Sequence, residues 1–298
     1  MPSTRDIRRR INSVKNTAKI TKAMQMVAAS KMRRAQQAAL AGRPYAALMN
    51  EVLGNVTFHA GDFTHPLMEK RDGAKRAVIL VATDKGLCGA LNGNLMREAA
   101  KFDKANTVFI TAGRKAAQFV ARSRRTLAAE FTYKDAPLFS EARAISKFAR
   151  EMFLKGDVDR VDILYTSFIS TLSQRPDLKP FLPIGEVKAV KAGIQDHKAE
   201  EKHQAEEELL HGSTEFLFEP SANQVLAAML PHSLNFQVYQ ILLEAKASEQ
   251  SAKMVAMKNA TDNANQLIKG LTLEYNKMRQ ASITKELLEI SSAAMAVG

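Results

Sequence analysis

The chain has 298 residues and a formal net charge of +12 at pH 7, with 46% hydrophobic and 6% aromatic residues and no Trp. This length and hydrophobic content suffice for one large globular domain or two modest ones, and the low aromatic content favours the Ala, Met and Leu packing of helical proteins. The charge indicates an acidic partner, which leaves nucleic acid, an anionic membrane surface and an acidic protein open. A single cysteine, Cys88, excludes an intramolecular disulfide and fits a reducing cytosol. No apolar run reaches the roughly 18 residues of a membrane-spanning helix.

Residues 3–58 are predicted to form a helical unit. Ser3 is a suitable N-cap, Asp6 places an acid in the first turn, and Pro44 marks a possible kink. Apolar or small residues recur in alternating steps of four and three, which is typical of a coiled-coil seam. This seam consists of Ile7, Ile11, Val14, Ala18, Thr21, Met24 and Ala28.

A different pattern follows the turn-rich boundary at residues 59–75. Short apolar runs of strand length alternate with helical stretches, which predicts an α/β unit with a largely parallel sheet. Residues 171–185, which contain three prolines, are expected to form an irregular connection with room for one edge strand. Strands are expected at 77–83, 107–112 and 161–169, and helices at 91–104, 114–124 and 140–155.

Residues 195–212 form a polar, acid-biased tract that contains His197, His203 and His211. The spacing of these histidines matches no compact metal-ligand motif, so a solvated surface segment is favoured over a metal cluster. Residues 215–219 are a further candidate strand. Ser221 is expected to cap a short helix, and Pro231 is expected to interrupt that helix or to open the next one.

The C-terminal stretch, residues 246–290, is predicted to be one unbroken helix, because it contains no proline and a single glycine, Gly270. At 1.5 Å per residue it would span roughly 65–70 Å, much longer than a helix of a compact domain. A helix of that length needs a partner, and the N-terminal seam supplies one. The predicted fold is α/β plus a long antiparallel coiled coil, in which the N- and C-terminal helices pair and an α/β domain is inserted between them. The C-terminal seam consists of Ala260, Ala264, Leu267, Leu271, Met278 and Ala281.

A glycine-rich stretch at residues 84–93 follows a strand and precedes a helix, an arrangement that can cradle phosphate. Its spacing is neither GxGxxG nor GxxxxGK followed by Ser or Thr, so a tight structural turn is favoured over nucleotide binding. Cys88 has no assignable His or acid partner for a nucleophile role, and no catalytic constellation is found in the sequence. The enzyme alternative is a nucleotide-dependent α/β domain at residues 74–190.

Residues 1–40 carry ten Lys and Arg residues against one acid, Asp6. Basic helical faces bind nucleic acid, but they also meet acidic protein loops, and many are merely solvated. A basic coiled-coil protein that acts on nucleic acid is therefore the binding-module alternative.

Motifs at both ends and in the middle of the chain resemble the gamma subunits of F-type ATP synthases, in the expected order and over nearly the whole length. They are KITKAMQMVAASKMRRAQ at 19–36, TDKGLCGALN at 83–92, SEQSAKMVAMKNATDNA at 248–264 and YNKMRQASITKELLEI at 275–290. The resemblance is to bacterial forms. It implies a Rossmann-like α/β domain without a bound nucleotide, and no cofactor, metal or active site of the chain's own.

The resemblance implies the function of a central rotor shaft in the F1 sector of a proton-translocating ATP synthase. Such a shaft couples rotation of the c-ring to ATP synthesis or hydrolysis at the alpha/beta catalytic sites. The implied partners are three alpha and three beta subunits, the epsilon subunit and the c-ring of F0, with no nucleic acid and with the membrane contacted only indirectly through F0. The implied location is peripheral, on the cytoplasmic face of the bacterial plasma (inner) membrane.

The resemblance also assigns contact residues. Arg279, Gln280 and Thr284 belong to the region that catches beta-subunit loops, and Met24 lies on the opposing helix near an acidic beta-subunit loop. An apolar tip is expected to sit in the apolar sleeve of the alpha/beta cylinder. It comprises Leu287, Leu288 and Ile290, with Met295 and Val297 beyond them. The expected domains are an N-terminal coiled-coil helix at 1–58, the α/β domain at 74–220 and a C-terminal helical segment at 221–298.

Overall fold

The computed structural model describes residues 3–60, 64–185, 219 and 221–297. The polar tract at 195–212 and residues 215–218 of the expected strand lie outside the described residues. The chain divides into two compact units, one made of residues 1–28 and 253–298 and the other of residues 29–252. We call the first the coiled-coil unit and the second the sheet unit.

The sheet unit is built on five strands in the order β3-β2-β1-β4-β5. Neighbouring strands from β3 to β4 pair in parallel, whereas β5 pairs with β4 in the antiparallel sense. The largely parallel sheet is as predicted, and the proline-containing strand β5 lies at an edge, where the missing N–H groups of proline are tolerated. The strands are β1 (Arg76–Val81), β2 (Thr107–Ala112), β3 (Thr126–Phe131), β4 (Arg160–Phe168) and β5 (Gln174–Leu182).

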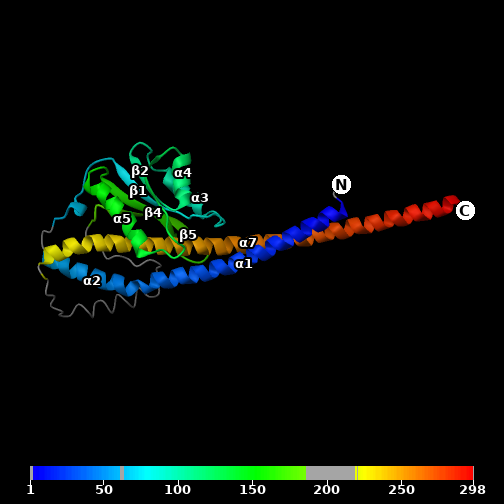
Figure 1. Ribbon diagram of the computed structural model, residues 1–298, viewed down its shortest axis with the longest axis horizontal. Coiled ribbons are helices and arrows are strands. Elements are labelled where there is room, and N and C mark those ends of the chain that lie inside the picture. The colour runs from blue at the N-terminus through cyan, green and yellow to red at the C-terminus, as the bar shows by residue number, and fades with distance from the viewer. Residues whose placement is uncertain (1–2, 61–63, 186–218, 220, 298) are drawn as a thin grey trace. The chain divides into compact units, whose positions relative to one another are not determined.

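Helices cover both faces of this sheet (Figure 1). Alternate residues of β1 point to opposite faces, since Ile79 and Val81 belong to one apolar cluster and Val78 and Leu80 to the other. The first cluster packs against α5 (Phe139–Leu154) and α7 (Ala222–Val297), and the second against α3 (Leu91–Ala100) and α4 (Arg114–Arg122). Helix α7 is therefore a structural layer of the α/β domain as well as a long helix.

Two secondary-structure predictions for this region were wrong. Strand β3 was not predicted, because its Ala-rich, largely exposed sequence has low strand propensity and the strand forms by pairing with β2. Helix α3 ends at Ala100, earlier than expected, because the guanidinium of Arg125 donates to the carbonyls of Ala100 and Phe102 at 2.7 and 2.9 Å. Carbonyl groups at a helix end need such partners.

The prediction at Pro231 was also wrong, because α7 continues through this residue as one helix. Ser221 precedes the helix and accepts a hydrogen bond from the Gln224 N–H at 3.4 Å, as expected of an N-cap. Leu230 and Leu234 on either side of the proline are buried, so tertiary packing holds the helix where local propensity opposes it.

The N-terminal helix bends near the expected place. Helix α1 (Thr4–Ala41) is followed directly by α2 (Arg43–Ala60), with Gly42 between them and Pro44 one residue beyond. The Gln240 amide of α7 lies so close to Gly42 that an added Cβ would overlap it. A larger residue at this junction would have to displace the end of the Gln240 side chain. Helix α2 then packs apolar residues, including Met49 and Leu53, against α7.

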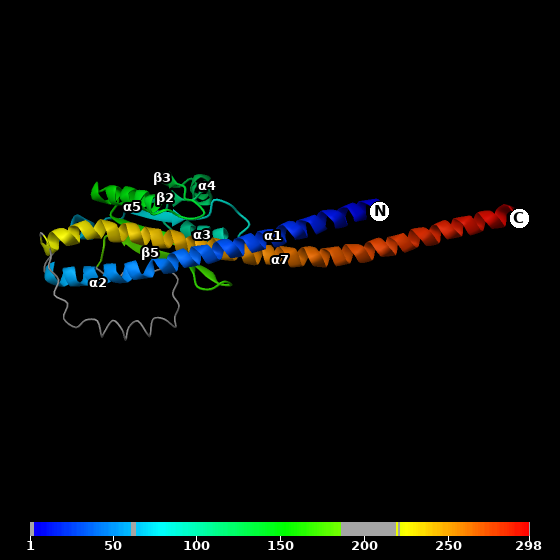
Figure 2. The same ribbon diagram turned by 60° about the horizontal axis from the view of Figure 1, so that its bottom comes forward.

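In the coiled-coil unit α1 and α7 lie side by side and antiparallel (Figures 1 and 2). Ile7 and Ile11 form an apolar cluster with Leu271, which Ile268 and Tyr275 extend. At the same seam the hydroxyls of Thr21 and Thr261 share a buried hydrogen bond of 2.7 Å. Paired helices of this kind together with the inserted α/β domain are the fold class that the sequence predicted.

The N-terminal seam is largely as predicted, since Ile7, Ile11, Ala18, Thr21 and Ala28 are buried, whereas Val14 and Met24 are half-buried. Ser3 and Asp6 form the expected cap, with the Ser3 hydroxyl donating to the Asp6 carboxylate at 2.7 Å. These hydrogen bonds lower the pKa of Asp6.

Two predicted members of the C-terminal seam were wrong. Leu267 is 46% exposed, because the seam steps from Ala264 to Ile268 instead. Ala281 is exposed for a different reason. Counted outward from the Thr21–Thr261 pair, Met278 falls opposite the first residue of α1, so Ala281 has no helix beside it.

Removing a seam side chain should destabilise the coiled-coil unit, whereas removing an outward neighbour should not. Leu271→Ala deletes a side chain that is 7% exposed and should lower the free energy of unfolding by about 2 kcal/mol. Leu273→Ala, at a 74% exposed site on the same helix, should change it by less than about 0.5 kcal/mol. Urea unfolding followed by circular dichroism measures both, and equal effects would contradict the seam.

Candidate functional site

Helix α7 is buried on every side from residue 241 to residue 251. A helix in such surroundings is usually apolar all round, yet this stretch carries Glu244, Lys246 and Glu249, each no more than 5% exposed. Burying a charge is costly unless the group is paired and hydrogen-bonded. The partners of these three residues therefore define the candidate functional site, which we call the α7 clamp.

Glu244 binds the C-terminal end of β4. Its carboxylate accepts hydrogen bonds from the Ser167 hydroxyl at 2.6 Å, the Phe168 N–H at 3.1 Å and the Tyr165 hydroxyl at 3.2 Å. Burial, together with the neighbouring Glu244 carboxylate, raises the pKa of Tyr165. Three donors converge on one carboxylate, which attaches α7 to a central strand of the sheet.

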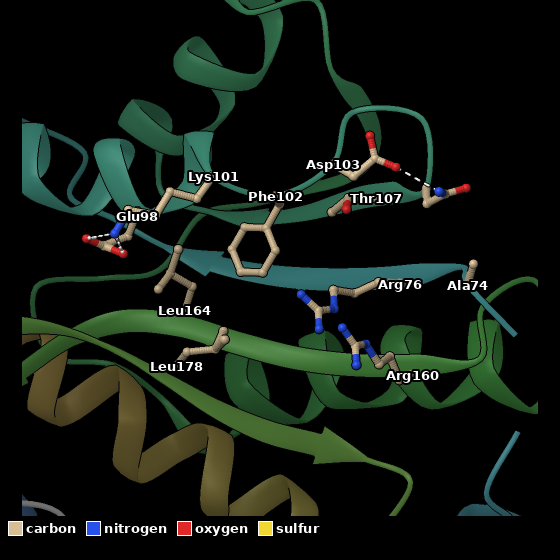
Figure 3. Close-up of a pocket in the computed structure, with 11 residues that line it drawn as sticks. Ala74, Arg76, Glu98, Lys101, Phe102, Asp103, Thr107, Arg160, Leu164 and Leu178 are labelled. Atoms are coloured by element: carbon tan, nitrogen blue, oxygen red, sulfur yellow. Dashed lines mark hydrogen bonds and ion pairs between the residues drawn. The ribbon is translucent and has the colours of Figure 1, made fainter. Parts of the chain in front are cut away.

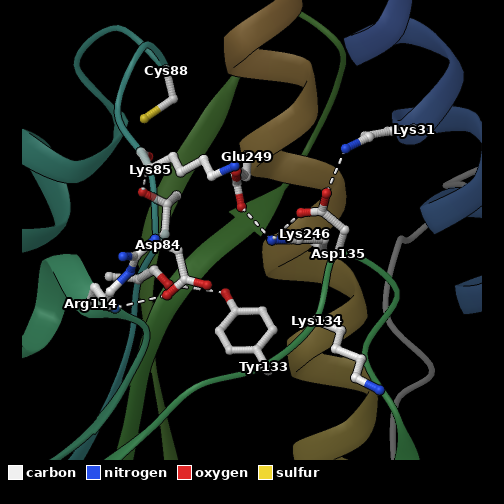
Figure 4. A network of polar contacts seen from close by, with 12 residues as sticks. Lys31, Asp84, Lys85, Cys88, Arg114, Tyr133, Lys134, Asp135, Lys246 and Glu249 are labelled. Atoms are coloured by element: carbon white, nitrogen blue, oxygen red, sulfur yellow. Dashed lines mark hydrogen bonds and ion pairs between the residues drawn. The ribbon is translucent and has the colours of Figure 1, made fainter.

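Lys246 lies between two carboxylates. Its ammonium group is 2.9 Å from the Glu249 carboxylate and 3.3 Å from the Asp135 carboxylate, and it lies 5.0 Å from the centre of the Tyr133 ring (Figure 4). Burial alone would lower the pKa of Lys246, but the two carboxylates outweigh it and raise this pKa. Lys246 is therefore charged and holds the loop after β3 on α7.

The loop after β3 makes the outer half of the clamp. The buried Tyr133 hydroxyl donates to the Ala82 carbonyl, just past the end of β1, at 3.0 Å. Asp135 contacts Lys246 with one carboxylate oxygen and Lys31 of α1 with the other, at 2.5 Å (Figure 4). The hydrogen bond from Lys31 is the main cause that lowers the pKa of Asp135 to about 2. Asp135 thus bridges a helix from each end of the chain.

The clamp lies where β1 and β4 end, which is the point at which the strand order reverses. Open α/β sheets usually bind ligands outside the carboxyl ends of the strands at this position. Here Glu244 and Tyr133 bond to the end of β4 and to the residue after β1, respectively. The edge that serves ligands in other α/β proteins serves in this chain to attach α7.

Side chains of the glycine-rich turn after β1 hydrogen-bond to one another and to the start of α4. The Asn92 amide donates to the Thr83 hydroxyl at 2.8 Å and to the buried Cys88 sulfur at 3.2 Å. Asp84 accepts from the Arg114 N–H at 2.9 Å, at the start of α4. This pattern fits the tight structural turn that the sequence favoured.

A pocket of about 420 Å³ opens near the other ends of the strands (Figure 3). Arg76 and Arg160 begin β1 and β4, and the Nε atoms of both lie near the Asp162 carboxylate, at 3.0 and 3.8 Å. Burial raises the pKa of Asp162. Across the pocket Glu98 pairs with Lys101 at 2.7 Å. The other lining carboxylate, Asp103, accepts a hydrogen bond from the Asn106 amide at 2.7 Å.

In the described part of the chain, no three His, Cys, Asp or Glu side chains are grouped to hold a metal ion. None of the described helices combines the length and the apolar character needed to cross a membrane.

The structure places the predicted contact residues in the coiled-coil unit. Arg279, Gln280 and Thr284 are all exposed on α7 within about two turns, and the Thr284 hydroxyl donates back to the Gln280 carbonyl at 3.0 Å. Met24 is half-buried on α1. Counted from the Thr21–Thr261 pair, it lies roughly 30 Å along the coiled coil from Arg279. The structure therefore presents two separate surfaces, and their contacts with other subunits stay predictions.

The predicted tip is exposed as well. Leu287, Leu288 and Ile290 lie beyond the end of α1 and expose more than half of their surface. Met295 is also exposed, whereas the side chain of Val297 is not described.

The α7 clamp was not predicted from the sequence. One signal was available, because Lys246 and Glu249 are spaced three apart, as the partners of an ion pair within one helix are. Their partner Asp135 lies more than a hundred residues away, and no sequence pattern joins it to them.

The fold and the α7 clamp define a class of protein. In the sequence, an α/β domain is inserted between the two helices of an antiparallel coiled coil. The edge of its sheet that binds ligands in other α/β proteins binds the chain's own helix α7. Comparison with known proteins gives the family. The profile of the ATP synthase family matches residues 3–297. The ATP synthase gamma chain of Methylacidiphilum infernorum is 46% identical over 303 residues, which cover 100% of both chains. The gamma chain of Opitutus terrae is 46% identical over 307 residues and 99% of each chain.

Solved structures agree in fold. A chain of the Euglena gracilis mitochondrial ATP synthase rotor has a TM-score of 0.62 at 19% identity and covers 94% of this chain and 98% of its own. A chain of the OSCP/F1/c-ring structure from the same organism has a TM-score of 0.63 at 21% identity, covering 99% and 94%. This chain belongs to the ATP synthase gamma chain family, as its motifs indicated.

Asp135 should make stability depend on pH in a defined window. Its pKa is about 2 in the folded chain against 3.8 ordinarily, so its stabilising effect is present above pH 4 and is lost as the pH falls toward 2. Because Asp135 is largely exposed, Asp135→Asn should lower the free energy of unfolding by less than about 1 kcal/mol at pH 6. Urea unfolding from pH 6 to pH 2 should show this difference vanish. A difference that grows on acidification would contradict the assignment.

Proposed function

We propose that this chain is the central rotor shaft of a proton-translocating F-type ATP synthase, and that it couples rotation of the c-ring to ATP synthesis or hydrolysis at sites held by the alpha and beta subunits. The observation that carries the proposal is the 46% sequence identity, over the full length, to an ATP synthase gamma chain. In addition, α7 continues past the end of its partner helix α1. The chain is a non-catalytic subunit of that enzyme.

The mechanism follows from asymmetry. A two-helix shaft inside a ring of three equivalent catalytic subunits touches each of them differently at any moment. Each subunit is then biased toward a different conformation, and the difference in contact free energy couples the angle of the shaft to nucleotide affinity. The apolar seam around Ile11 and Leu271 keeps the two helices together as this contact changes.

The surface of the shaft suits contacts that form and break. Arg279, Gln280 and Thr284 form the proposed catch for beta-subunit loops, and exposed ion pairs of about 0–1 kcal/mol separate readily at each step. Met24 is the proposed contact of α1 with an acidic beta-subunit loop. This assignment takes the exposed basic residues of α1 as a protein-binding face, in place of the nucleic-acid alternative.

The tip supports a separate contact. Leu287, Leu288 and Ile290 expose apolar surface on a helix that has no partner beside it. Such a surface calls for a covering partner, and an apolar sleeve at the top of the alpha/beta cylinder is the proposed one.

We assign the roles of the parts of the chain by the domains expected from the sequence. The helices at 1–58 and 221–298 form the shaft, and the α/β domain at 74–220 joins it to the c-ring of F0 and to the epsilon subunit. The chain is then peripheral, on the cytoplasmic face of the bacterial inner membrane, and meets the membrane only through F0.

Co-purification tests the proposal directly. A tagged chain expressed in its own cells and extracted from membranes with a mild detergent should bring down alpha and beta subunits in equal amounts, with c subunits. Recovery of nucleic acid and no alpha or beta subunit would instead favour the binding-module alternative.

Arg279 supplies a residue-level prediction. Arg279→Ala should lower steady-state ATP hydrolysis by a reconstituted alpha–beta–gamma complex by about five-fold, because one exposed charged contact of about 1 kcal/mol in the stepping state is lost. Lys269→Ala removes an exposed charge nearer the middle of the same helix and should retain more than half of the rate. A wild-type rate for Arg279→Ala would remove this residue from the catch.

A further inference from the structure

The two shaft helices are attached to the α/β domain with unequal strength. Helix α7 contributes five buried residues to the core beneath the sheet, and Glu244 adds three hydrogen bonds at β4. Helix α1 meets the same domain through smaller contacts. Ala35 packs with Phe168 and Ala247, and Lys31 pairs with Asp135. The core residues of α7 are Leu234, Val238, Ile241, Leu242 and Ala245.

The ion pairs of the α7 clamp differ in exposure in the same way, because the pair within α7 is buried and the pair with α1 is exposed. Lys246 and Glu249 are each 3% exposed, so water and salt screen their attraction little. Lys31 and Asp135 are 42% and 59% exposed, and a pair in that environment is weak and is readily broken. Asp135 lies at the boundary, with one oxygen on the buried lysine and the other on the exposed lysine.

We propose that Asp135 is a positioning residue that latches α1 to the α/β domain: its contact with Lys246 holds it on α7, and its contact with Lys31 is the releasable half. This inference rests on the proposed rotor function and deepens it. With the latch closed, torque received by the α/β domain reaches both helices. With the latch open, α7 still turns with the domain, whereas residues 29–41 of α1 keep only the smaller contact at Ala35, and torque reaches α1 less directly.

The structure indicates that this latch can be removed without unfolding the chain. After Asp135→Asn, Lys246 keeps its 2.9 Å pair with Glu249, Tyr133 keeps its hydrogen bond to Ala82, and the apolar core is untouched. Lys31→Gln removes the outer pair alone. Lys31→Arg keeps the charge and is the conservative rescue.

A matched control is available on α5. Lys147 and Glu151 form an exposed ion pair at 3.8 Å within that one helix. Lys147→Gln therefore breaks an exposed pair that joins no two elements.

The test uses the assembled enzyme in membrane vesicles and two readouts. Hydrogen exchange measures opening in residues 29–41 of α1 and in residues 233–250 of α7. Proton pumping divided by ATP hydrolysis measures coupling. Asp135→Asn and Lys31→Gln should speed exchange in the α1 segment about three-fold and leave the α7 segment unchanged. They should also lower the pumping ratio by about half while ATP hydrolysis continues. Lys31→Arg and Lys147→Gln should match the wild type in both readouts.

Unchanged hydrogen exchange in the α1 segment would overturn the latch proposal. Equal acceleration of hydrogen exchange in the α1 and α7 segments would overturn it as well. Faster exchange in α1 with an unchanged pumping ratio would overturn its part in coupling. A wild-type complex that contains this chain but pumps no protons would instead count against the proposed rotor function, so the two failures are distinguishable.

Discussion

The charges of α7 between residues 241 and 251 constrain the rest of the structure, because the helix is buried there on every side. Glu244, Lys246 and Glu249 cannot be satisfied by water, so the chain itself must supply their partners. It does so at the ends of β1 and β4, with Tyr133 and Asp135 from the loop after β3. This explains why a sheet with the strand order of a ligand-binding domain is joined to a long helix at its usual ligand edge.

A single helix thereby has two roles that call for different surfaces. Within the sheet unit α7 is a core layer, and its residues pack tightly under β1 and β4. Within the coiled-coil unit it buries only a narrow seam, and past Met278 it has no helix beside it. The exposed end of α7 beyond the seam is suited to contacts that form and break. The buried part of α7 in the sheet unit is suited to transmitting force. The sequence changes accordingly, from the apolar run around Leu242 to the polar stretch around Arg279.

Periodic features could be predicted from the sequence and long-range polar contacts could not. Heptad spacing gave the pairing of Ile7 and Ile11 with the C-terminal helix, because a repeated pattern reports which face is buried. The same reasoning selected Leu267 in place of Ile268, since two adjacent apolar residues satisfy the pattern equally. Strand β3 and the continuity of α7 through Pro231 depend on tertiary partners that override local propensity. Asp135 was missed because nothing local marks its contact with Lys31 or Lys246.

The central claim is that the shaft turns inside a stationary ring of alpha and beta subunits and that the α/β domain turns with it. Observation of single molecules tests it most directly. A bead attached through a cysteine introduced at Leu172, which is 83% exposed in the turn between β4 and β5, would report rotation of the α/β domain. With the ring fixed to a surface and ATP supplied, the account predicts rotation in one direction with three pauses per turn. A stationary bead on complexes that hydrolyse ATP at the normal rate would contradict it.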